Sequence, residues 1–405
     1  MPPPEPAWRW ASATSTLPET GAAASEVADA LAGELGGSPV SLALAFFSPH
    51  HVRQAGRIAA VLRATLTPGC LAGASAQGVV STRHEIEREP ALTVIAAHLP
   101  GVTLHPFVLL NESWAEASND PLEFARLTPG ATGAELVLLM GDPFSLDVER
   151  VLGGFNRHAP GLRVVGGMAS AGPRPGSNAL LLNDWAAGEG GFGIAFAGAL
   201  RADVVVSQGC RPVGPPLEVT RAQGNLVIEL DGQPALERAE QVLQGIAESE
   251  RARLQHGLYV GRPARPGASG RGDYLIRNLL GADRDHGVLA IGDRVDEKER
   301  VRLHVRDAET AREDLEMLLS PQAYDGRAGA ALVFACNSRG RGLYGRADGD
   351  ISIVQEALGG QPGPVPAAGM FCAGEIGPVG EKNFLHGHTA SLAVMRPKPA
   401  AAARA

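Results

Sequence analysis

Residues 331–345, ALVFACNSRGRGLYG, begin as an apolar run and end in a loop that is rich in glycine and arginine. A short apolar run that stops at polar residues and glycine predicts a buried β-strand. Cys336, Asn337, Arg339 and Arg341 lie at the end of this strand and directly after it. Because ligand sites in open parallel sheets lie beyond the carboxyl ends of the strands, the stretch predicts a candidate site as well as a strand.

Two other stretches share the layout of this one, and the three together decide the fold. Each has an apolar strand, a polar loop, an amphipathic helix, a Gly/Pro turn and a second strand that ends on small residues. We predict that the first strands, LALAFF (42–47), ELVLLM (135–140) and ALVFAC (331–336), are interior strands. The helices that follow are predicted to start within about three residues of Val52, Asp147 and Asp350.

Each repeat is predicted to be a βαβ unit that continues into further β-like sequence, such as ALTVIAAHLPG after the first. Parallel strand pairs need helical crossovers and are usually covered on both faces. We therefore expect a mixed α/β fold, in which repeated β-α-β-β units form mixed sheets with helices packed on them. The length of 405 residues favours two domains, with a division near residue 235.

Composition limits the class of molecule and its partners. A net charge of -8 argues against a broad basic surface for nucleic acid. The chain begins without an apolar signal region and has no apolar stretch of membrane-spanning length, so we expect a cytoplasmic protein that binds no membrane. The cysteines form no C-x-x-C pair, which argues against a zinc ribbon or disulfide framework and fits a reducing compartment. They are Cys70, Cys210, Cys336 and Cys372.

Several long motifs, in this order, resemble those of the FIST proteins, which pair a FIST N domain with a FIST C domain. The motifs are VTRAQGNLVIELDGQPAL (219–236), GDYLIRNLLGAD (272–283), VRLHVRDAETAREDL (301–315), FACNSRGRGLYG (334–345) and GMFCAGEIGPVGEKNFLHGHTASL (369–392). The resemblance implies a FIST N domain at 35–235 and a FIST C domain at 236–395. A proline- and alanine-rich segment (1–34) would precede them, and a disordered tail (396–405) would follow.

The resemblance also implies a role. FIST domains are regarded as small-ligand binders in signal transduction, with amino acids as a suggested ligand class. A cytoplasmic sensor with an amino-acid-like ligand and a signalling protein as partner is therefore expected. Relatives often carry a signalling output domain or an F-box, and this chain matches neither. No output pathway is implied for that reason.

Two charges of opposite sign are the main candidates for ligand contacts. Arg339 and Arg341 lie in a loop whose glycines expose backbone N–H groups, which suits a carboxylate or a phosphate. Glu375 lies among small residues in CAGEIG, where a buried carboxylate could hold an ammonium group. A ligand that met both charges would be a zwitterion of the amino-acid type. The alternative is arginines on a solvated turn and a surface glutamate.

The histidines and cysteines give weaker signals. His386 and His388 stand two apart in a predicted strand and would share one face, as suits a metal or proton transfer. No third metal ligand can be named nearby, and histidines on a solvated sheet face are the alternative. Cys336 and Cys372 end the two strands of the third repeat. A thiol nucleophile with a histidine base can be imagined there, but cysteine commonly packs as a small hydrophobe.

The sequence thus predicts a small-ligand-binding protein with no metal, no cofactor and no catalytic residue. The alternatives are an enzyme in which Cys336 or Cys372 attacks a small metabolite, and a protein–protein adaptor. The predicted ligand-binding residues are Cys336, Asn337, Arg339, Arg341, Cys372, Glu375, His386 and His388.

Overall fold

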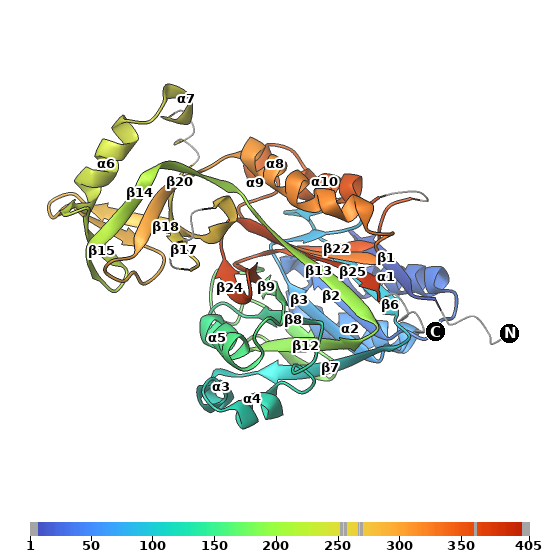
Figure 1. Ribbon diagram of the computed structural model, residues 1–405. Helices are drawn as coiled ribbons and strands as arrows, with labels where there is room; N and C mark the ends of the chain where they lie inside the picture. Colours follow the sequence, from blue (N-terminus) through green and yellow to red (C-terminus); the bar gives the residue numbers. More distant parts are fainter. Residues whose placement is uncertain are drawn as a thin grey trace, which may run out of the picture. The chain divides into compact units, whose positions relative to one another are not determined.

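The computed structural model describes residues 7–251, 254, 257–265, 267, 270–359 and 363–398. The chain folds into two compact units (Figure 1). Unit 1 comprises Met1–Val206, Glu316–Leu385 and Thr389–Ala405, and unit 2 comprises Ser207–Leu315 and His386–His388. The divisions after residues 206 and 315 make unit 2 an insertion within unit 1, whereas the sequence predicted one division near residue 235.

Unit 1 contains three six-stranded mixed sheets with a common plan. The first sheet has the order β1 (Arg9–Ser15), β6 (Leu92–His98), β2 (Leu42–Phe47), β3 (Cys70–Ser75), β10 (Leu180–Leu182) and β11 (Trp185–Ala187). The second has β7 (Val102–Leu109), β12 (Gly191–Gly198), β8 (Leu136–Gly141), β9 (Val164–Met168), β23 (Glu375–Val379) and β24 (Lys382–His386). The third has β13 (Leu200–Gln208), β25 (Thr389–Pro397), β21 (Ala330–Cys336), β22 (Ala367–Cys372), β4 (Gly78–Val80) and β5 (Glu85–Glu87).

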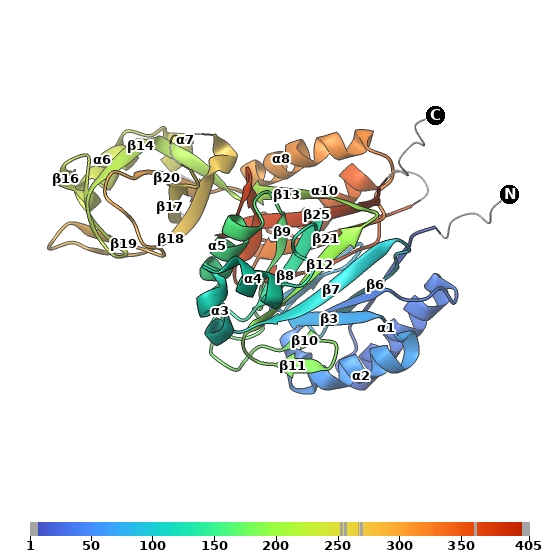
Figure 2. The same ribbon diagram turned by 60° about the horizontal axis from the view of Figure 1, so that its bottom comes forward.

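Each repeat gives its hairpin to the sheet of another repeat. The first repeat, β1 to β6, places β4–β5 against β22 of the third sheet. The second, β7 to β12, places β10–β11 against β3 of the first sheet (Figure 2). The third, β13 to β25, places β23–β24 against β9 of the second sheet. The three exchanges close a cycle, so every sheet is completed by strands from a distant part of the chain.

One glycine occupies the same place in all three repeats. It lies on the second parallel strand of the repeat. Its partner on the first parallel strand, directly opposite, is the fourth residue of β2, β8 or β21. A side chain on this glycine would collide with the carbonyl oxygen of its partner. The added Cβ would lie 2.5 Å from Ala45 O at Gly73, 1.9 Å from Leu139 O at Gly166 and 1.7 Å from Val333 O at Gly369. The repeats therefore share strand register as well as strand order.

Substitution Gly369→Ala tests this close packing of β21 against β22. The added methyl group would meet backbone that is buried in the middle of the sheet, so we expect a loss of roughly 3 kcal/mol in the free energy of unfolding. Gly33→Ala is the matched control, because nothing lies within 4 Å of its added Cβ and the site is in a helix. It should be neutral or stabilise by up to about 1 kcal/mol. Chemical denaturation measures both, and equal midpoints would contradict the argument.

The core of unit 1 lies between the three sheets. Their inner faces share one buried cluster, in which Phe46 of the first sheet meets Phe334 of the third with ring centroids 6.0 Å apart. The outer face of the first sheet packs against α1 (Thr20–Leu35) and α2 (Ala55–Leu66). The outer face of the second packs against α3 (Asn111–Ala117), α4 (Pro121–Leu127) and α5 (Val148–His158). In the third repeat, α10 (Gly349–Leu358) is the crossover between β21 and β22, and α8 (Ala308–Leu319) precedes β21.

The predicted repeats are confirmed. β2, β8 and β21 are interior strands. The helices begin at Ala55, Val148 and Gly349, each within three residues of its predicted start. Two short helices, η1 (Pro49–Gln54) and α9 (Arg341–Tyr344), precede α2 and α10. The mixed α/β class with repeated β-α-β-β units follows from the apolar periodicity of these segments.

The two ends of the chain carry more structure than their composition indicates. The proline- and alanine-rich segment 1–34 contains β1 and most of α1. β25 continues to Pro397, which is inside the segment predicted as a disordered tail. Residues 399–405 of that tail lie outside the described residues. No helix in the described ranges has both the length and the apolar character needed to cross a membrane.

Unit 2 is built on one antiparallel sheet that closes on itself, because β14 pairs with both β20 and β15. Its strands are β14 (Cys210–Gln223), β20 (Arg300–Arg306), β17 (Leu258–Pro263), β18 (Tyr274–Asp283), β19 (Val288–Ile291), β15 (Leu226–Leu230) and β16 (Gln233–Pro234). The helix α6 (Ala235–Gln244) packs on its core, and the short helices α7 (Glu248–Arg251), η3 (Arg271–Asp273) and, in unit 1, η4 (Ser320–Tyr324) complete the fold. Arg262 and Arg277 both contact Asp293, at 2.6 and 2.7 Å.

Candidate functional site

The candidate site lies at the carboxyl ends of β21 and β22. These parallel strands end side by side at Cys336 and Cys372, as predicted. The loop after β21 bends across both strand ends, because Asn337 N donates to Cys372 O at 2.9 Å and Arg339 N donates to Cys336 O at 2.8 Å. Glu375 begins β23 shortly after Cys372. The structure therefore brings together Cys336, Asn337, Arg339, Cys372 and Glu375.

Arg339 is buried, with 1% of its surface exposed, so the alternative of a solvated turn is wrong. Its Nε donates to Asp350 Oδ2 at 2.8 Å and its Nη2 donates to Asp350 Oδ1 at 2.6 Å. Tyr344 Oη adds a contact to each partner, at 2.8 Å from Arg339 Nη2 and 2.7 Å from Asp350 Oδ1. The fork that was predicted to meet a ligand carboxylate is thus occupied by Asp350. Among the described residues, the buried Arg339 Nη1 has no hydrogen-bond partner.

A second buried carboxylate, Glu85, comes from the hairpin that the first repeat gives to the third sheet. Its Oε1 accepts from Asp350 N and Ile351 N, both at 2.8 Å, in the first turn of α10. Asp348 Oδ1 accepts in return from Glu85 N at 2.7 Å. Burial raises the pKa of Glu85 to about 8, and the nearby charge of Asp350 adds to the rise. Sequence reasoning missed Glu85, and no pattern around it indicates a partner in the third repeat.

Glu375 is fully buried, so the alternative of a surface charge is wrong here too. Its Oε2 accepts from Thr389 Oγ1 at 2.8 Å and from Thr389 N at 3.1 Å. Burial raises the pKa of Glu375 to about 8, although the bonds from Thr389, the charge of Arg339 and a hydrogen bond with Cys336 pull it down. Near neutral pH this carboxyl group is mainly protonated. We call Glu85, Arg339, Tyr344, Asp350 and Glu375 the buried polar cluster.

Burial disfavours the reactive thiolate form of Cys372. Cys372 is fully buried, and burial raises the pKa of its thiol well above the ordinary value, with further contributions from Glu375 and Cys336. A thiolate nucleophile is therefore disfavoured at Cys372. Cys336 is half-buried and accepts from Ser338 Oγ at 3.2 Å. All four cysteines are free of disulfide bonds.

The two histidines do not share one face of a strand, which corrects the prediction. His386 is the last residue of β24, and His388 lies in the turn before β25 with φ at 63°. The turn interrupts the alternation of side chains along the strand, so residues two apart no longer point to the same face. His388 Nε2 lies 2.9 Å from Asn278 Oδ1, and the His388 ring lies 4.3 Å from the Tyr259 ring, all within unit 2. No group of three or more His, Cys, Asp or Glu side chains in the described ranges could hold a metal ion.

Arg341 lies outside the buried polar cluster. It is exposed, and its backbone N donates to Glu87 Oε1 at 2.9 Å.

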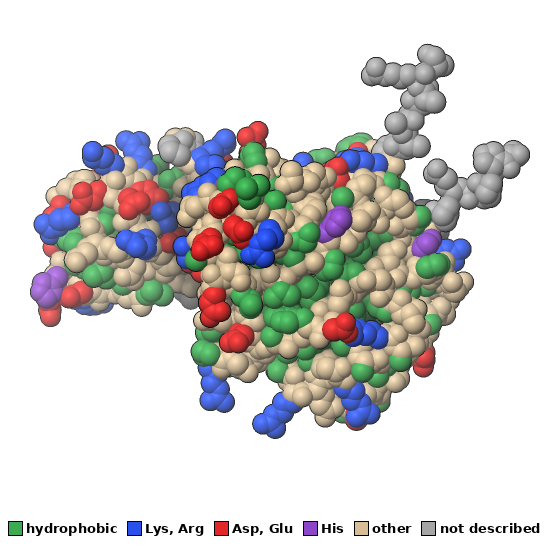
Figure 3. Space-filling model, turned by 90° about the horizontal axis from the view of Figure 1, so that it is seen from below, with side chains coloured by type: hydrophobic (Ala, Val, Ile, Leu, Met, Phe, Trp, Pro, Cys, Tyr) green, Lys and Arg blue, Asp and Glu red, His purple; other side chains and the backbone are tan. Residues whose placement is uncertain are grey.

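Over the face that Figure 3 shows, the described Lys and Arg side chains are mixed with Asp and Glu, and no large area of one sign is seen. This distribution agrees with the net charge of -8.

Two family descriptions match the chain. The FIST N domain matches residues 41–233, and the FIST C domain matches residues 235–378. FIST domains are associated with sensory signal transduction, and the fold of this chain is of the mixed α/β class. The chain belongs to the FIST family.

Relatives and solved structures add little on chemistry. An uncharacterized protein of Mycobacterium bovis is 38% identical over 392 residues, which cover 94% of this chain and 96% of that protein. An uncharacterized protein of Mycobacterium tuberculosis strain H37Rv is 38% identical over 394 residues, with 94% and 97% covered. A solved cyanuric acid hydrolase aligns over 96% of this chain and 99% of its own, with 9% identity and a TM-score of 0.33. A likeness this weak carries no argument on function.

Proposed function

We propose that this protein is a cytoplasmic sensor that binds a small amino-acid-like ligand at the carboxyl ends of β21 and β22. The ligand ammonium group would meet Glu375, and its carboxylate would meet Arg339 Nη1. The observation that carries the proposal is unmet hydrogen-bonding capacity in a buried place. Asn337 Oδ1 and Glu85 Oε2 lack a donor, and Arg339 Nη1 lacks an acceptor, among the described residues. Buried polar atoms are normally paired, so a guest with both kinds of group would complete the set.

Electrostatics supports a guest that carries a positive charge. A carboxyl group that is fully buried costs free energy in its ionised form unless a cation compensates it. The charge of Arg339 lowers the pKa of both Glu85 and Glu375, so all three groups lie within electrostatic reach. Asp350 already neutralises Arg339, which leaves the two glutamates without a cation of their own among the described residues. An ammonium group would supply one.

The role of Arg339 differs from the one predicted. Asp350 holds the Nε and Nη2 edge of the guanidinium, so one hydrogen bond from Nη1 remains for a ligand carboxylate. Arg339 therefore contacts the ligand through one atom, while Asp350 and Tyr344 position the side chain. A signalling protein as the downstream partner stays a prediction from the family. The four cysteines without disulfide bonds support a reducing, cytoplasmic location.

Glu375→Gln tests the ligand site once mass spectrometry has identified the amines released from the denatured protein. Binding of an ammonium group favours ionised Glu375, so its pKa should fall from about 8 and binding near pH 7 should release a proton. Calorimetry in two buffers of different ionisation enthalpy measures this release. Glu375→Gln should abolish it and weaken binding by roughly five- to a hundred-and-fifty-fold, which corresponds to about 1–3 kcal/mol.

The control for this experiment is Glu381→Gln, an exposed glutamate in the turn between β23 and β24. It should leave both affinity and proton release unchanged. Above pH 9 the release by the parent protein should vanish, because Glu375 is then ionised before the ligand arrives. Unchanged affinity and unchanged proton release in Glu375→Gln would refute the site. An enzyme with a Cys336 nucleophile would instead turn its ligand over, and an adaptor would copurify with a protein and no amine.

A further inference from the structure

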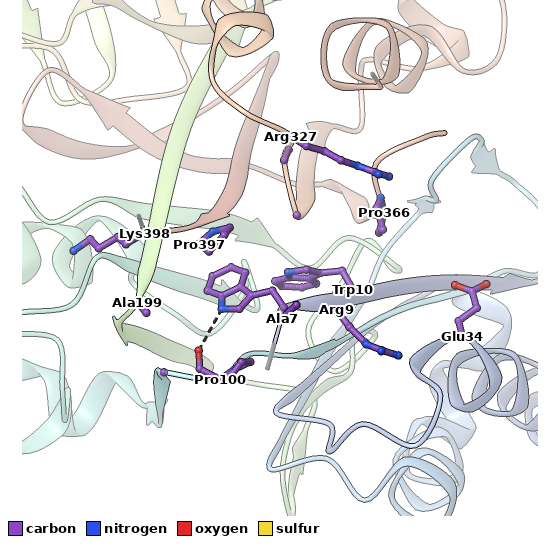
Figure 4. A pocket seen from close by; sticks show the side chains of 14 residues that line it. Ala7, Arg9, Trp10, Glu34, Pro100, Ala199, Arg327, Pro366, Pro397 and Lys398 are labelled. Carbon is purple, nitrogen blue, oxygen red and sulfur yellow. Dashed lines mark hydrogen bonds between the residues drawn. The ribbon is translucent and has the colours of Figure 1, made fainter. Parts of the chain in front are cut away.

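A cavity of about 900 Å³ lies in unit 1 where the junctions between the repeats meet (Figure 4). The chain segments after β6, β12 and β25 are joined here through their backbones. Ala199 N donates to Gly101 O at 2.9 Å, and Lys398 N donates to Ala199 O at 3.0 Å. The residues that line this cavity include no member of the buried polar cluster. The cavity is therefore separate from the candidate site described above.

Two indole rings give the cavity its apolar lining. Trp10 lies in β1, an edge strand, Trp8 directly precedes that strand, and both side chains line the cavity. Trp8 Nε1 donates to Pro100 O at 3.3 Å, which holds its ring against the junction after β6. Figure 4 shows the Trp10 ring at the cavity, and Trp8 lines the same cavity. Both are half-buried and leave part of their surface open to a guest.

Cations outnumber acids around these rings. Arg9, Arg327 and Lys398 line the cavity and are exposed, while Glu34 is the acid of the lining. Lys398 also pairs with Glu135, which lies outside the lining. Figure 4 shows Arg327 extended across the cavity from Trp10. A guanidinium in this place can donate hydrogen bonds to the carboxylate of a ring that lies on the indoles.

We propose that this cavity binds a planar aromatic carboxylate, with its ring stacked on Trp8 and Trp10 and its carboxylate at Arg327. Indole rings favour offset stacking with other aromatic rings, and the cations favour an anion. The volume lies within the range of small-molecule sites, so it fits a guest larger than an amino acid. This inference does not depend on the proposed function at Glu375.

The probe is 1-naphthoate, titrated into the intact protein by calorimetry, with 1-naphthylmethylammonium and cyclohexanecarboxylate as comparators. We expect 1-naphthoate to bind at least tenfold more tightly than either comparator. Trp8→Ala and Arg327→Gln should each weaken its binding at least tenfold, and Arg327→Lys should lose less than Arg327→Gln. The matched control is Arg346→Gln, an exposed arginine outside the lining, which should bind as the parent does.

Trp8→Phe keeps a smaller aromatic ring and serves if Trp8→Ala does not fold. It should retain part of the affinity. Glu375→Gln should bind 1-naphthoate normally, which separates this site from the proposed amine site. The proposal is overturned if 1-naphthoate shows no binding at millimolar concentration, if the naphthyl ammonium binds equally well, or if folded Trp8 and Arg327 variants keep full affinity.

Discussion

Neither half of the chain is expected to fold alone when it is cut between Pro234 and Ala235, at the junction of the two FIST regions. The first half would lose β23–β24, which pairs with β9 through Glu375 and Gly167. The second half would lose β4–β5, which pairs with β22 through Val80 and Gly369. It would also lose β13, the neighbour of β25. Each half would expose apolar sheet edges and the inner faces of the shared core.

Separate expression of residues 1–234 and 235–405 tests this expectation. We expect each fragment to be insoluble, or to lack cooperative unfolding in circular dichroism. Coexpression should give a soluble complex of both, because the missing hairpins are then supplied in trans. A fragment 235–405 that unfolds cooperatively by itself would show that the exchanged hairpin is dispensable.

Removal of residues 210–306 is the control, because it follows the boundary of unit 2. Gly209 O accepts from Asp307 N at 3.3 Å, so a short glycine linker can join the two ends. The buried clusters described between the three sheets and on the outer faces of the first and second sheets contain no residue from 210–306. We expect the shortened chain to keep cooperative unfolding. The cut after Pro234 divides the strands of unit 1 between two fragments, whereas this deletion leaves them on one chain. Different outcomes would show that unit 1 needs its exchanged hairpins.

Asp350→Ala is expected to destabilise the protein by about 3–5 kcal/mol, because it leaves the buried Arg339 guanidinium without its counter-ion. Both partners have only 1% of their side-chain surface exposed. Tyr344 Oη would lose its acceptor in the same step. Chemical denaturation at pH 7 measures the change in the free energy of unfolding.

Two further variants show whether the cost comes from an unpaired charge. Replacement of both partners, Arg339→Met with Asp350→Leu, should recover most of the lost stability, because no charge is then left buried. Glu123→Ala removes the exposed i,i+3 pair of Glu123 with Arg126, at 2.7 Å, and should cost at most about 1 kcal/mol. If Asp350→Ala costs no more than Glu123→Ala, the buried pair does not hold the loop after β21.

Part of the candidate site could be predicted from sequence because it is local. Cys336 and Cys372 were expected at the ends of parallel strands, and Glu375 was expected to be buried directly after the second of them. The partner of Arg339 was not predicted, although Asp350 is only 11 residues away. The spacing does not reveal it, because α9 turns the chain between the two residues. The prediction that His386 and His388 share a strand face was wrong for a similar reason, because His388 lies in a turn and not in a strand.

The sequence by itself determined the three βαβ repeats, since apolar periodicity and strand length act over a few neighbouring residues. Only the tertiary structure decided that the repeats exchange hairpins, because pairing of distant strands leaves no local pattern. It also decided that Glu85 meets Asp350 across 265 residues and that Trp8 lies beside the junctions of all three repeats. The chemistry of both proposed sites therefore depends on closure of the three-sheet unit, which brings together groups that no short stretch of sequence contains.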